Sequence, residues 1–510
     1  MEYDDIIIGA GSSGAVLAAR LSEDPGRSVL LLEAGPDYAT VEQTPDDLRS
    51  GRVQSVVLHD WGFNAHALPG RAIDYPRGKV TGGSSAVNSA VALRGIPEDY
   101  DEWAAMGNTE WAWNAVLPYF RKLETDRDEG GDFHGSTGPL PIKRPSGDEV
   151  LPEQQAFIDA CLAASLPPSR DMNDPDSTGV GIWPRNIIDG VRISTAIAYL
   201  GQARSRLNLT IRGGCLVHRI LIEDGRAVGV EVESGGEIQQ VRGGRVTLSA
   251  GAVVSPAILM RSGIGPAEEL ARHKIPLLQE LPVGRELIDH CMMGVLCIPR
   301  EGVTDLAKPT VQAGARYTAQ GSLERNDMQL VMTANIDLAD YPDYMDLLGS
   351  PVMMSVLAGL QRPLSRGSLT LVTRSATAQP RINLDFTSHP EDMRRLVDGL
   401  RLAWKVATSP AMAPMVESVA LLTEDAMQSD EALEEYVRST INTIYHPVAT
   451  CRMGPDDDPG AVVDQYCRVR GIEGLRVVDA SVMPAIPRAN TNLTCIMIGE
   501  RVADWMKSGA

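Results

Sequence analysis

The chain has 510 residues, of which 43% are apolar, so it is long enough for two or three domains with a large buried core. Its formal net charge of −20 has the same sign as nucleic acids and anionic membrane surfaces, which argues against both as partners. We find no apolar run of transmembrane length and no signal peptide before the first predicted strand, and the seven cysteines are scattered without a C-x-x-C pair. These features predict a soluble cytoplasmic protein without a membrane span.

The chain opens on the pattern of a dinucleotide-binding unit. Residues 4–8 include a continuous β-branched run that is typical of a buried parallel strand. A glycine-rich turn at 9–14 follows, then a helical stretch at 15–21 and a second buried strand at 28–32 that ends at Glu33. Strand, glycine-rich turn, helix, strand and acid together predict a Rossmann-like βαβ unit, and the pattern leaves open whether the dinucleotide is NAD or FAD.

The residues of this turn each have a physical role. Gly9 lets the chain turn tightly, Gly11 lets the backbone approach a diphosphate, and Gly14 lets the helix pack closely on the strand. The helix N-terminus offers free N–H groups and the positive end of its dipole to phosphates. The carboxylate of Glu33 can accept hydrogen bonds from ribose hydroxyls.

A second glycine-rich stretch lies at 76–88, after a region at 36–75 that we expect to be irregular. Small residues at this density indicate backbone that lies close to a ligand or to another segment. A flexible loop is the alternative interpretation, although Val80 and Val87 are unusual in an exposed linker. The next stretch, 98–123, is predicted to be helical.

The pattern changes to short strands from residue 207. Four strand-like runs predict an antiparallel meander inserted into the first domain; they lie at 209–211, 217–222, 227–232 and 245–248. The last run leads into a small-residue turn at 249–252 and a helix predicted from Ser255. Mixed strands and helices between 291 and 439 predict a second domain. From residue 440 the pattern of the first domain returns, with a final helix at 496–506.

Two polar residues near the C-terminus are candidate catalytic groups. His446 precedes a proline and therefore lies in extended or turn backbone, where a histidine with a pKa near neutrality can act as a general base. Judged by residue type alone, a structural histidine is the simpler interpretation, and Asn490 can equally cap the final helix. We find no spacing typical of metal ligands, so no metal is expected.

Five motifs occur together and in order: the turn at 9–14, Gly78 to Asn88, Ser249 to Gly251 with 262–265, His446 to Gly454, and Asp479 to Asn492. In this combination the sequence resembles the glucose–methanol–choline (GMC) oxidoreductases, a family of FAD enzymes, and among them the choline-dehydrogenase-like and hydroxymethylfurfural-oxidase-like members. The resemblance covers nearly the whole chain and is weakest between 300 and 365. It implies an α/β fold with a Rossmann-like FAD-binding domain at 1–290 and 440–510. The second domain, at 291–439, would be an α+β substrate-binding domain with an antiparallel sheet.

The resemblance also implies roles for individual residues. It places a catalytic histidine at His446 and a catalytic histidine or asparagine at Asn490, both facing the flavin N5, and a structural role at His290. Val87 stands where some members carry a histidine bonded to the flavin, so FAD should be non-covalent. The implied FAD-binding residues are Gly9, Gly11, Ser12, Ser13, Gly14, Glu33, Ala34, Gly78, Val80, Gly82, Gly83, Ser84, Val87, Asn88, Val217, Ala250, Gly251, Asp479, Ala480, Asn490 and Thr491.

The activity implied by the resemblance is the oxidation of a small-molecule alcohol to an aldehyde or ketone. His446 would take the hydroxyl proton and Asn490 would hold the oxygen, while hydride passes to the flavin. Molecular oxygen, a quinone or a protein can each serve as the electron acceptor. An FAD-containing hydroxynitrile lyase of the same fold is the alternative. A non-catalytic FAD-binding protein would not need both residues, and the light-driven decarboxylases of the family are not expected to keep this histidine.

Overall fold

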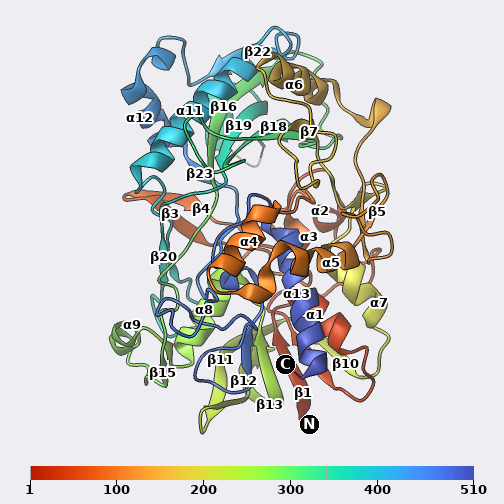
Figure 1. Ribbon diagram of the computed structural model, residues 1–510, viewed down its shortest axis with the longest axis vertical. Coiled ribbons are helices and arrows are strands. Elements are labelled where there is room, and N and C mark those ends of the chain that lie inside the picture. Colours follow the sequence, from red (N-terminus) through yellow and green to blue (C-terminus); the bar gives the residue numbers. More distant parts are fainter. Residues whose placement is uncertain (1, 340–341, 510) are drawn as a thin grey trace.

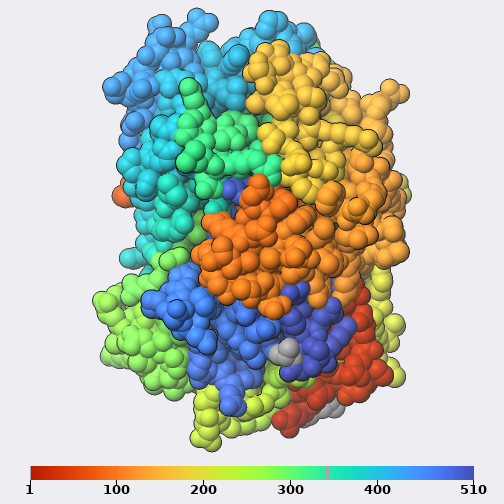
Figure 2. All heavy atoms as spheres, viewed as in Figure 1, coloured from red at the N-terminus to blue at the C-terminus, as the bar shows by residue number. Residues whose placement is uncertain are grey.

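Two large sheets, one at each end of the molecule, dominate the computed structural model of this chain (Figure 1). The structure describes residues 2–339 and 342–509. Both chain termini lie at the end that holds the first sheet (Figure 1). On the face seen in Figure 2, the orange segment with α4 (Pro97–Ala105) and α5 (Trp113–Leu123) covers the junction between the two ends.

The first sheet has a parallel core that is buried on both faces. Its strands are β10 (Leu209–Arg212), β2 (Val29–Leu32), β1 (Tyr3–Ile8) and β13 (Glu237–Leu248) in spatial order, with β24 (Leu475–Val477) beside β13. The continuous apolar runs of β1 and β2 fit this position, because helices or loops cover both sides of such strands. The first helix, α1 (Gly14–Leu21), packs against the last, α13 (Thr491–Ser508) (Figure 1). The predicted βαβ unit is therefore confirmed.

The predicted antiparallel meander is correct only in part. β11 (Cys215–Glu223), β12 (Arg226–Ser234) and the first half of β13 pair antiparallel. The run at 209–211 is instead β10, which pairs in parallel with β2, and the run at 245–248 pairs in parallel with β1. Short apolar runs carry no information on the direction of their partner, so only the tertiary structure could separate the two cases.

Several predicted element bounds also need correction. The stretch 98–123 forms two helices, α4 and α5, and the region 36–75 contains a hairpin of β3 (Asn64–Leu68) and β4 (Arg71–Asp74). The helix predicted from Ser255 begins at Gly251 as α8 (Gly251–Arg261), and the final helix begins at Thr491. Both helices thus begin directly at the small-residue turns before them.

The second sheet is antiparallel throughout. Its spatial order is β22 (Val416–Ala420), β16 (Cys291–Pro299), β19 (Val352–Leu360), β18 (Met328–Asp337), β17 (Ala313–Tyr317) and β7 (Gly179–Ile182), with the short β23 (Asn442–Thr443) beside β16. The helices α11 (Pro390–Ala407) and α6 (Pro152–Ala163) pack on it. The strand β7 and the helix α6 precede residue 290, so this unit includes segments from outside the range 291–439.

Two further observations concern the predictions on cysteines and membranes. All seven cysteines are buried and free, as expected of cysteines packed as small hydrophobic residues. None of the described helices combines the length and the hydropathy needed to cross a bilayer.

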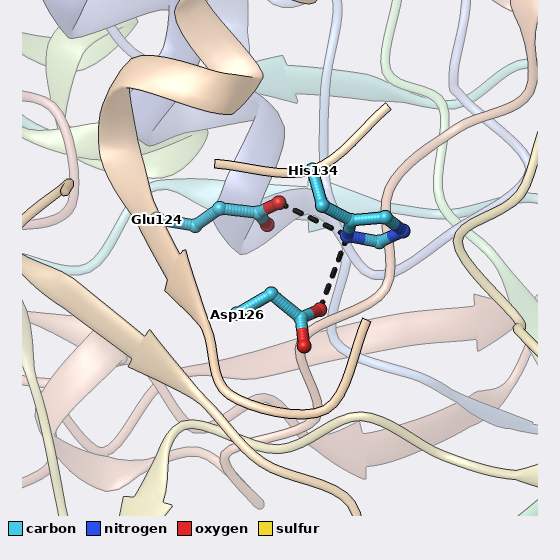
Figure 3. A group of neighbouring side chains, drawn as sticks. All are labelled: Glu124, Asp126 and His134. Atoms are coloured by element: carbon cyan, nitrogen blue, oxygen red, sulfur yellow. Dashed lines mark hydrogen bonds and ion pairs between the residues drawn. The ribbon is translucent and has the colours of Figure 1, made fainter. Parts of the chain in front are cut away.

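A buried cluster of Glu124, Asp126 and His134 has the composition of a metal site (Figure 3). His134 Nδ1 lies 3.2 Å from Glu124 and 3.1 Å from Asp126, and its Nε2 lies 2.8 Å from Asp171. Both ring nitrogens therefore face carboxylates. Burial opposes the charged ring, but the hydrogen bonds to Asp126, Asp171 and Glu124 raise the pKa of His134 to about 10.

Two arginines complete the charge balance of this cluster. Arg94 contacts Glu124 at 2.8 Å, and Arg144 contacts both Asp126 (2.9 Å) and Asp171 (2.7 Å). A metal ligand must be a neutral imidazole with a free lone pair, whereas a doubly hydrogen-bonded imidazolium offers none. The cluster is accordingly an ion-pair network that joins the chain segments that carry these side chains.

The close packing at Gly14 gives a first test of the fold. A Cβ atom at Gly14 would lie 1.9 Å from the carbonyl oxygen of Gly9, which belongs to rigid backbone. We expect Gly14→Ala to lower the free energy of unfolding by about 1–3 kcal/mol, the usual cost of overpacking. Gly130→Ala, where a Cβ would have open space, is the control. Circular dichroism melting curves measure both, and an unchanged melting temperature for Gly14→Ala would contradict the packing argument.

The ion-pair network predicts a pH-dependent contribution to stability. Because the pKa of His134 is raised in the folded chain, its stabilisation is complete below about pH 6.5 and is lost as the pH rises toward about 10. His134→Gln should therefore lower the melting temperature most at pH 6 and less at pH 9.5. The exposed His66, replaced in the same way, is the control. Equal losses at both pH values would show that His134 is not held as an imidazolium.

Candidate functional site

A cavity of about 730 Å³ lies between the two sheets. One end lies at the carboxyl ends of β1 and β2, and the other is walled by β16, β18 and β19. This is where a parallel α/β sheet binds its ligand. The structure brings most of the predicted site residues to this cavity: Gly9, Gly11, Ser12, Ser13, Glu33, Ala34, Gly78, Gly83, Ser84, Val87, Asn88, Val217, Ala250, Gly251, Asp479, Ala480, Asn490, Thr491 and His446.

Three predicted cofactor residues do not line the cavity. Gly14 packs against Gly9, as described above. Val80 is buried in a small apolar cluster with Leu48 and Val87. Gly82 has a positive φ of 100° and lies close to Ala196, so it shapes the turn without reaching the cavity.

The N-termini of three helices, α1, α8 and α13, meet at the cavity. Ser13, Gly251 and Thr491 mark these ends. The N-cap residues of α1 and α13 make no side-chain capping bond, whereas the first N–H of α8 is bound by Asp479. The free N–H groups and the three positive dipole ends suit an anionic ligand such as a diphosphate. Gly11 and Gly83 lie backbone against backbone here, because a Cβ on Gly83 would lie 2.7 Å from the Cα of Gly11.

Side chains at this end hold the backbone in place. The carboxylate of Glu33 accepts hydrogen bonds from the N–H groups of Ala10 (3.0 Å) and Gly35 (2.9 Å), and burial raises its pKa to about 7. Asp479 accepts from the N–H of Gly251 (2.9 Å) and the hydroxyl of Ser255 (2.6 Å), which fixes the start of α8. Glu33 lines the cavity as predicted, and it also fixes the glycine-rich turn, which sequence analysis did not foresee.

His446 lies at the middle of the cavity, on the segment that follows β23. Its backbone N–H donates to the carboxylate of Asp289 (2.8 Å), which also accepts from the hydroxyls of Tyr75 (2.6 Å) and Thr443 (2.6 Å). Tyr445 before it has a positive φ of 67°, a conformation that L-residues rarely adopt. The bonds to Asp289 therefore hold a strained turn that points His446 into the cavity.

The ring of His446 lies between His290 and Asn490. Its Nδ1 is 2.9 Å from His290 Nδ1, and its Nε2 is 3.2 Å from the amide nitrogen of Asn490. His290 Nε2 is 3.0 Å from the carbonyl oxygen of Gln361, which can only accept. Asn490 stands at the N-cap of α13 but makes no capping bond, so the capping alternative does not describe its side chain.

These contacts assign the protons of both rings. Burial lowers the pKa of His290 to about 3, so His290 is neutral, carries its proton on Nε2 and accepts at Nδ1. His446 then donates from Nδ1. Burial, with the positive charge of Arg77 and the neighbouring His290 as smaller causes, also holds the pKa of His446 well below its usual value. The neutral ring of His446 thus presents an unprotonated Nε2 beside Asn490.

Sequence analysis missed several contributors to the site. Arg77 lines the cavity and donates to the carbonyl oxygen of Tyr445 at 2.8 Å. The direct contact of His290 with His446 was not foreseen either, since 156 positions separate them. The only feature of the sequence that could have indicated this contact is the adjacent pair Asp289 and His290. Polar residues of the second sheet carry no motif.

The sequence of this chain is similar to those of known proteins. The family model for GMC oxidoreductase matches residues 3–292, and a second one of the same family matches residues 363–499. An oxygen-dependent choline dehydrogenase 1 of Chromohalobacter salexigens is 38% identical, over 99% of this chain and 95% of the relative. An oxygen-dependent choline dehydrogenase of Escherichia coli O6:H1 is also 38% identical, over 99% and 96%.

Solved structures show the same fold. The crystal structure of pyridoxine 4-oxidase from Mesorbium loti superposes with a TM-score of 0.90 at 31% identity, over 99% of both chains. A formate oxidase variant of Aspergillus oryzae RIB40 superposes with a TM-score of 0.90 over 100% of this chain and 98% of the other, and at 24% identity it supports the fold alone. Members of the family bind FAD, typically without a covalent link, and the uncapped N-termini of α1 and α13 fit its diphosphate. This chain therefore belongs to the GMC oxidoreductase family and is a FAD-dependent oxidoreductase that acts on the CH–OH group of donors.

Proposed function

We propose that this enzyme oxidises a small-molecule alcohol to an aldehyde or ketone, with His446 as the general base and Asn490 as the residue that positions the alcohol oxygen. The observation that supports these roles is the unprotonated Nε2 of His446 beside the amide of Asn490, both at the cavity. A base and a hydrogen-bond donor side by side are what the removal of a hydroxyl proton requires. In this proposal residues 1–290 and 440–510 hold FAD, and residues 291–439, with β7 and α6, hold the substrate.

The proton transfer follows from the hydrogen bonds. The hydroxyl proton of the alcohol moves to His446 Nε2, while the amide of Asn490 donates to the oxygen that becomes negative. The imidazolium formed at His446 keeps its Nδ1–H bond to His290, so the ring does not turn during the transfer. FAD, when bound, supplies the acceptor for the hydride that leaves the carbinol carbon. Transfer of the hydroxyl proton to His446 Nε2 favours the departure of the hydride, because it leaves negative charge on the alcohol oxygen.

The electron acceptor and the substrate are part of the same proposal. The names of the relatives suggest choline and pyridoxine as candidate substrates, and oxygen as a candidate acceptor beside a quinone or a protein. The hydroxynitrile lyase alternative gains no support from the relatives described above, which are named as dehydrogenases and oxidases.

The role of His446 is tested by its replacement with alanine. His446→Ala should retain FAD, because the ring lies beside the substrate space, and flavin reduction by a good alcohol should slow by about 10²–10⁴-fold. Anaerobic rapid mixing that follows flavin absorbance measures the rate. His66→Ala, at an exposed position, is the control. Because the pKa of His446 lies well below 6.5, the parental rate should be constant from about pH 7 to pH 9 and fall at acid pH. A near-parental rate in His446→Ala would contradict the proposed base.

The hydrogen bond between His446 and His290 predicts that two substitutions of His290 slow flavin reduction to different degrees. His290→Leu removes the acceptor of the His446 Nδ1–H and should slow flavin reduction by about 10-fold or more. His290→Gln offers a carbonyl oxygen in its place and should recover part of the loss. The limiting rate should change and the dissociation constant of the alcohol should not, since His290 is one ring removed from the substrate. Equal rates in both variants would show that the hydrogen bond has no part in the reaction.

A further inference from the structure

The residues of β16, β18 and β19 that face the cavity are neutral. Alternate residues of a strand face opposite sides of a sheet, and in β16, β18 and β19 one set packs under α11 while the other faces the cavity. The cavity-facing set is Met292, Gly294, Leu296, Gln329, Val331, Thr333, Met353, Ser355, Leu357 and Gly359. Ile336, Leu421 and Ile444 add further apolar surface to this chamber.

Charged groups are confined to other parts of the cavity. Among the described residues that line it, the carboxylates are Glu33 and Asp479, and both lie at the helix N-termini and accept backbone hydrogen bonds there. The charged side chain near His446 is the cation Arg77. A positively charged substrate would therefore enter a chamber whose described walls offer no counter-ion.

The aromatic liners do not form a cage for a cation either. Trp61 already has the ammonium of Lys79 over its ring at 4.7 Å, and Tyr445 has Arg77 at 5.8 Å. Tyr436 donates its hydroxyl to the carbonyl oxygen of Gly294. Quaternary ammonium groups are bound by several aromatic faces that converge. Among the described aromatic residues that line the cavity, no ring contact joins any two of Trp61, Trp183, Tyr344 and Tyr436.

One polar side chain on this wall lacks a partner. Thr333 and Ser355 bond to each other at 2.5 Å. Gln329 is only 4% exposed, lines the cavity and has no hydrogen-bond partner for its amide among the described residues. Because Gln329 lines the cavity, its amide is free to bind a ligand or water there.

The sheet register places Gln329 in a row that ends at Asn442, four residues before His446. Gly359 pairs with both Met292 and Gln329, and Met292 also pairs with Asn442 of β23. A Cβ on Gly359 would lie 2.7 Å from the side chain of Ile444, so glycine is needed here for Ile444 to pack on this row.

We propose that the substrate is an uncharged alcohol with a mainly apolar body and one neutral hydrogen-bonding group, which the amide of Gln329 binds. This inference rests on the proposed alcohol oxidation and adds its substrate class. It separates neutral alcohols from quaternary ammonium alcohols, which the described walls do not accommodate.

A matched pair of alcohols tests the charge preference. Choline and 3,3-dimethylbutan-1-ol have nearly the same shape and differ in the charge of one atom. Anaerobic rapid mixing should give a ratio of limiting rate to dissociation constant at least about 100-fold higher for the neutral alcohol, because burial of an unpaired cation is costly. An equal or higher ratio for choline would overturn this inference and leave the alcohol oxidation intact. No flavin reduction by any alcohol of either panel would contradict the oxidation itself.

A second panel tests Gln329. The three pyridinemethanols replace one ring CH of benzyl alcohol by a neutral acceptor, and the best of them should exceed benzyl alcohol by about 10-fold. Gln329→Leu should abolish this preference through a weaker dissociation constant for the pyridine alcohol. The exposed Gln155, replaced by leucine, should keep it.

The near-isosteric Gln329→Met keeps the test decisive if the leucine variant does not fold, because it removes the amide without adding a charge opposite Arg316, the register partner of Gln329. It should lose the pyridine preference as well. An unchanged pyridine preference in both variants would remove Gln329 from the substrate site.

Discussion

The buried carboxylate of Asp289 is the point at which three distant segments of the chain meet. Tyr75, directly before the glycine-rich stretch at 76–88, Thr443 and the backbone of His446 all donate to it. Burial raises the pKa of Asp289, and an ionised carboxylate in such a place is tolerated only where several donors converge. Because His290 follows Asp289 directly, the same constraint places both histidines at the boundary between the two sheets.

The walls of the cavity depend on buried arginines in a similar way. Arg192 donates to the carbonyl oxygens of Asp47 (3.2 Å) and Leu48 (2.9 Å), and Arg185 to those of Gly51 (2.9 Å) and Ser89 (2.8 Å). Burial lowers the pKa of each guanidinium to about 10, so both remain charged at neutral pH. The short helix α2 (Asp46–Arg49) and the irregular backbone at Gly51 and Ser89 leave carbonyl groups unpaired, and these two side chains satisfy them. The segments beside the cavity are thereby fixed.

The two sheets contribute different chemistry to one cavity. The parallel sheet leads into helix N-termini whose backbone N–H groups suit a phosphate, and glycine is needed because the backbone itself would be the binding surface. The antiparallel sheet presents alternate side chains, and those alone set the character of the substrate chamber. His446 and Asn490 lie where these surfaces join. Cofactor binding and substrate selection can therefore change independently in this architecture.

Sequence alone determined what depends on local pattern. The βαβ unit and the glycine-rich turns could be predicted, because backbone that approaches a phosphate demands glycine at fixed spacing. Site roles for His446 and Asn490 were implied by the family resemblance and not by the local pattern. Only the tertiary structure decided the direction of β10, the membership of β7 in the second sheet, and the bonds of His446 to His290 and Asp289. Strand direction and contacts between residues 156 positions apart leave no periodic trace. The position of Gln329 at the cavity could not be predicted for the same reason, since the surroundings of a strand residue are known only when its register and its neighbours are known.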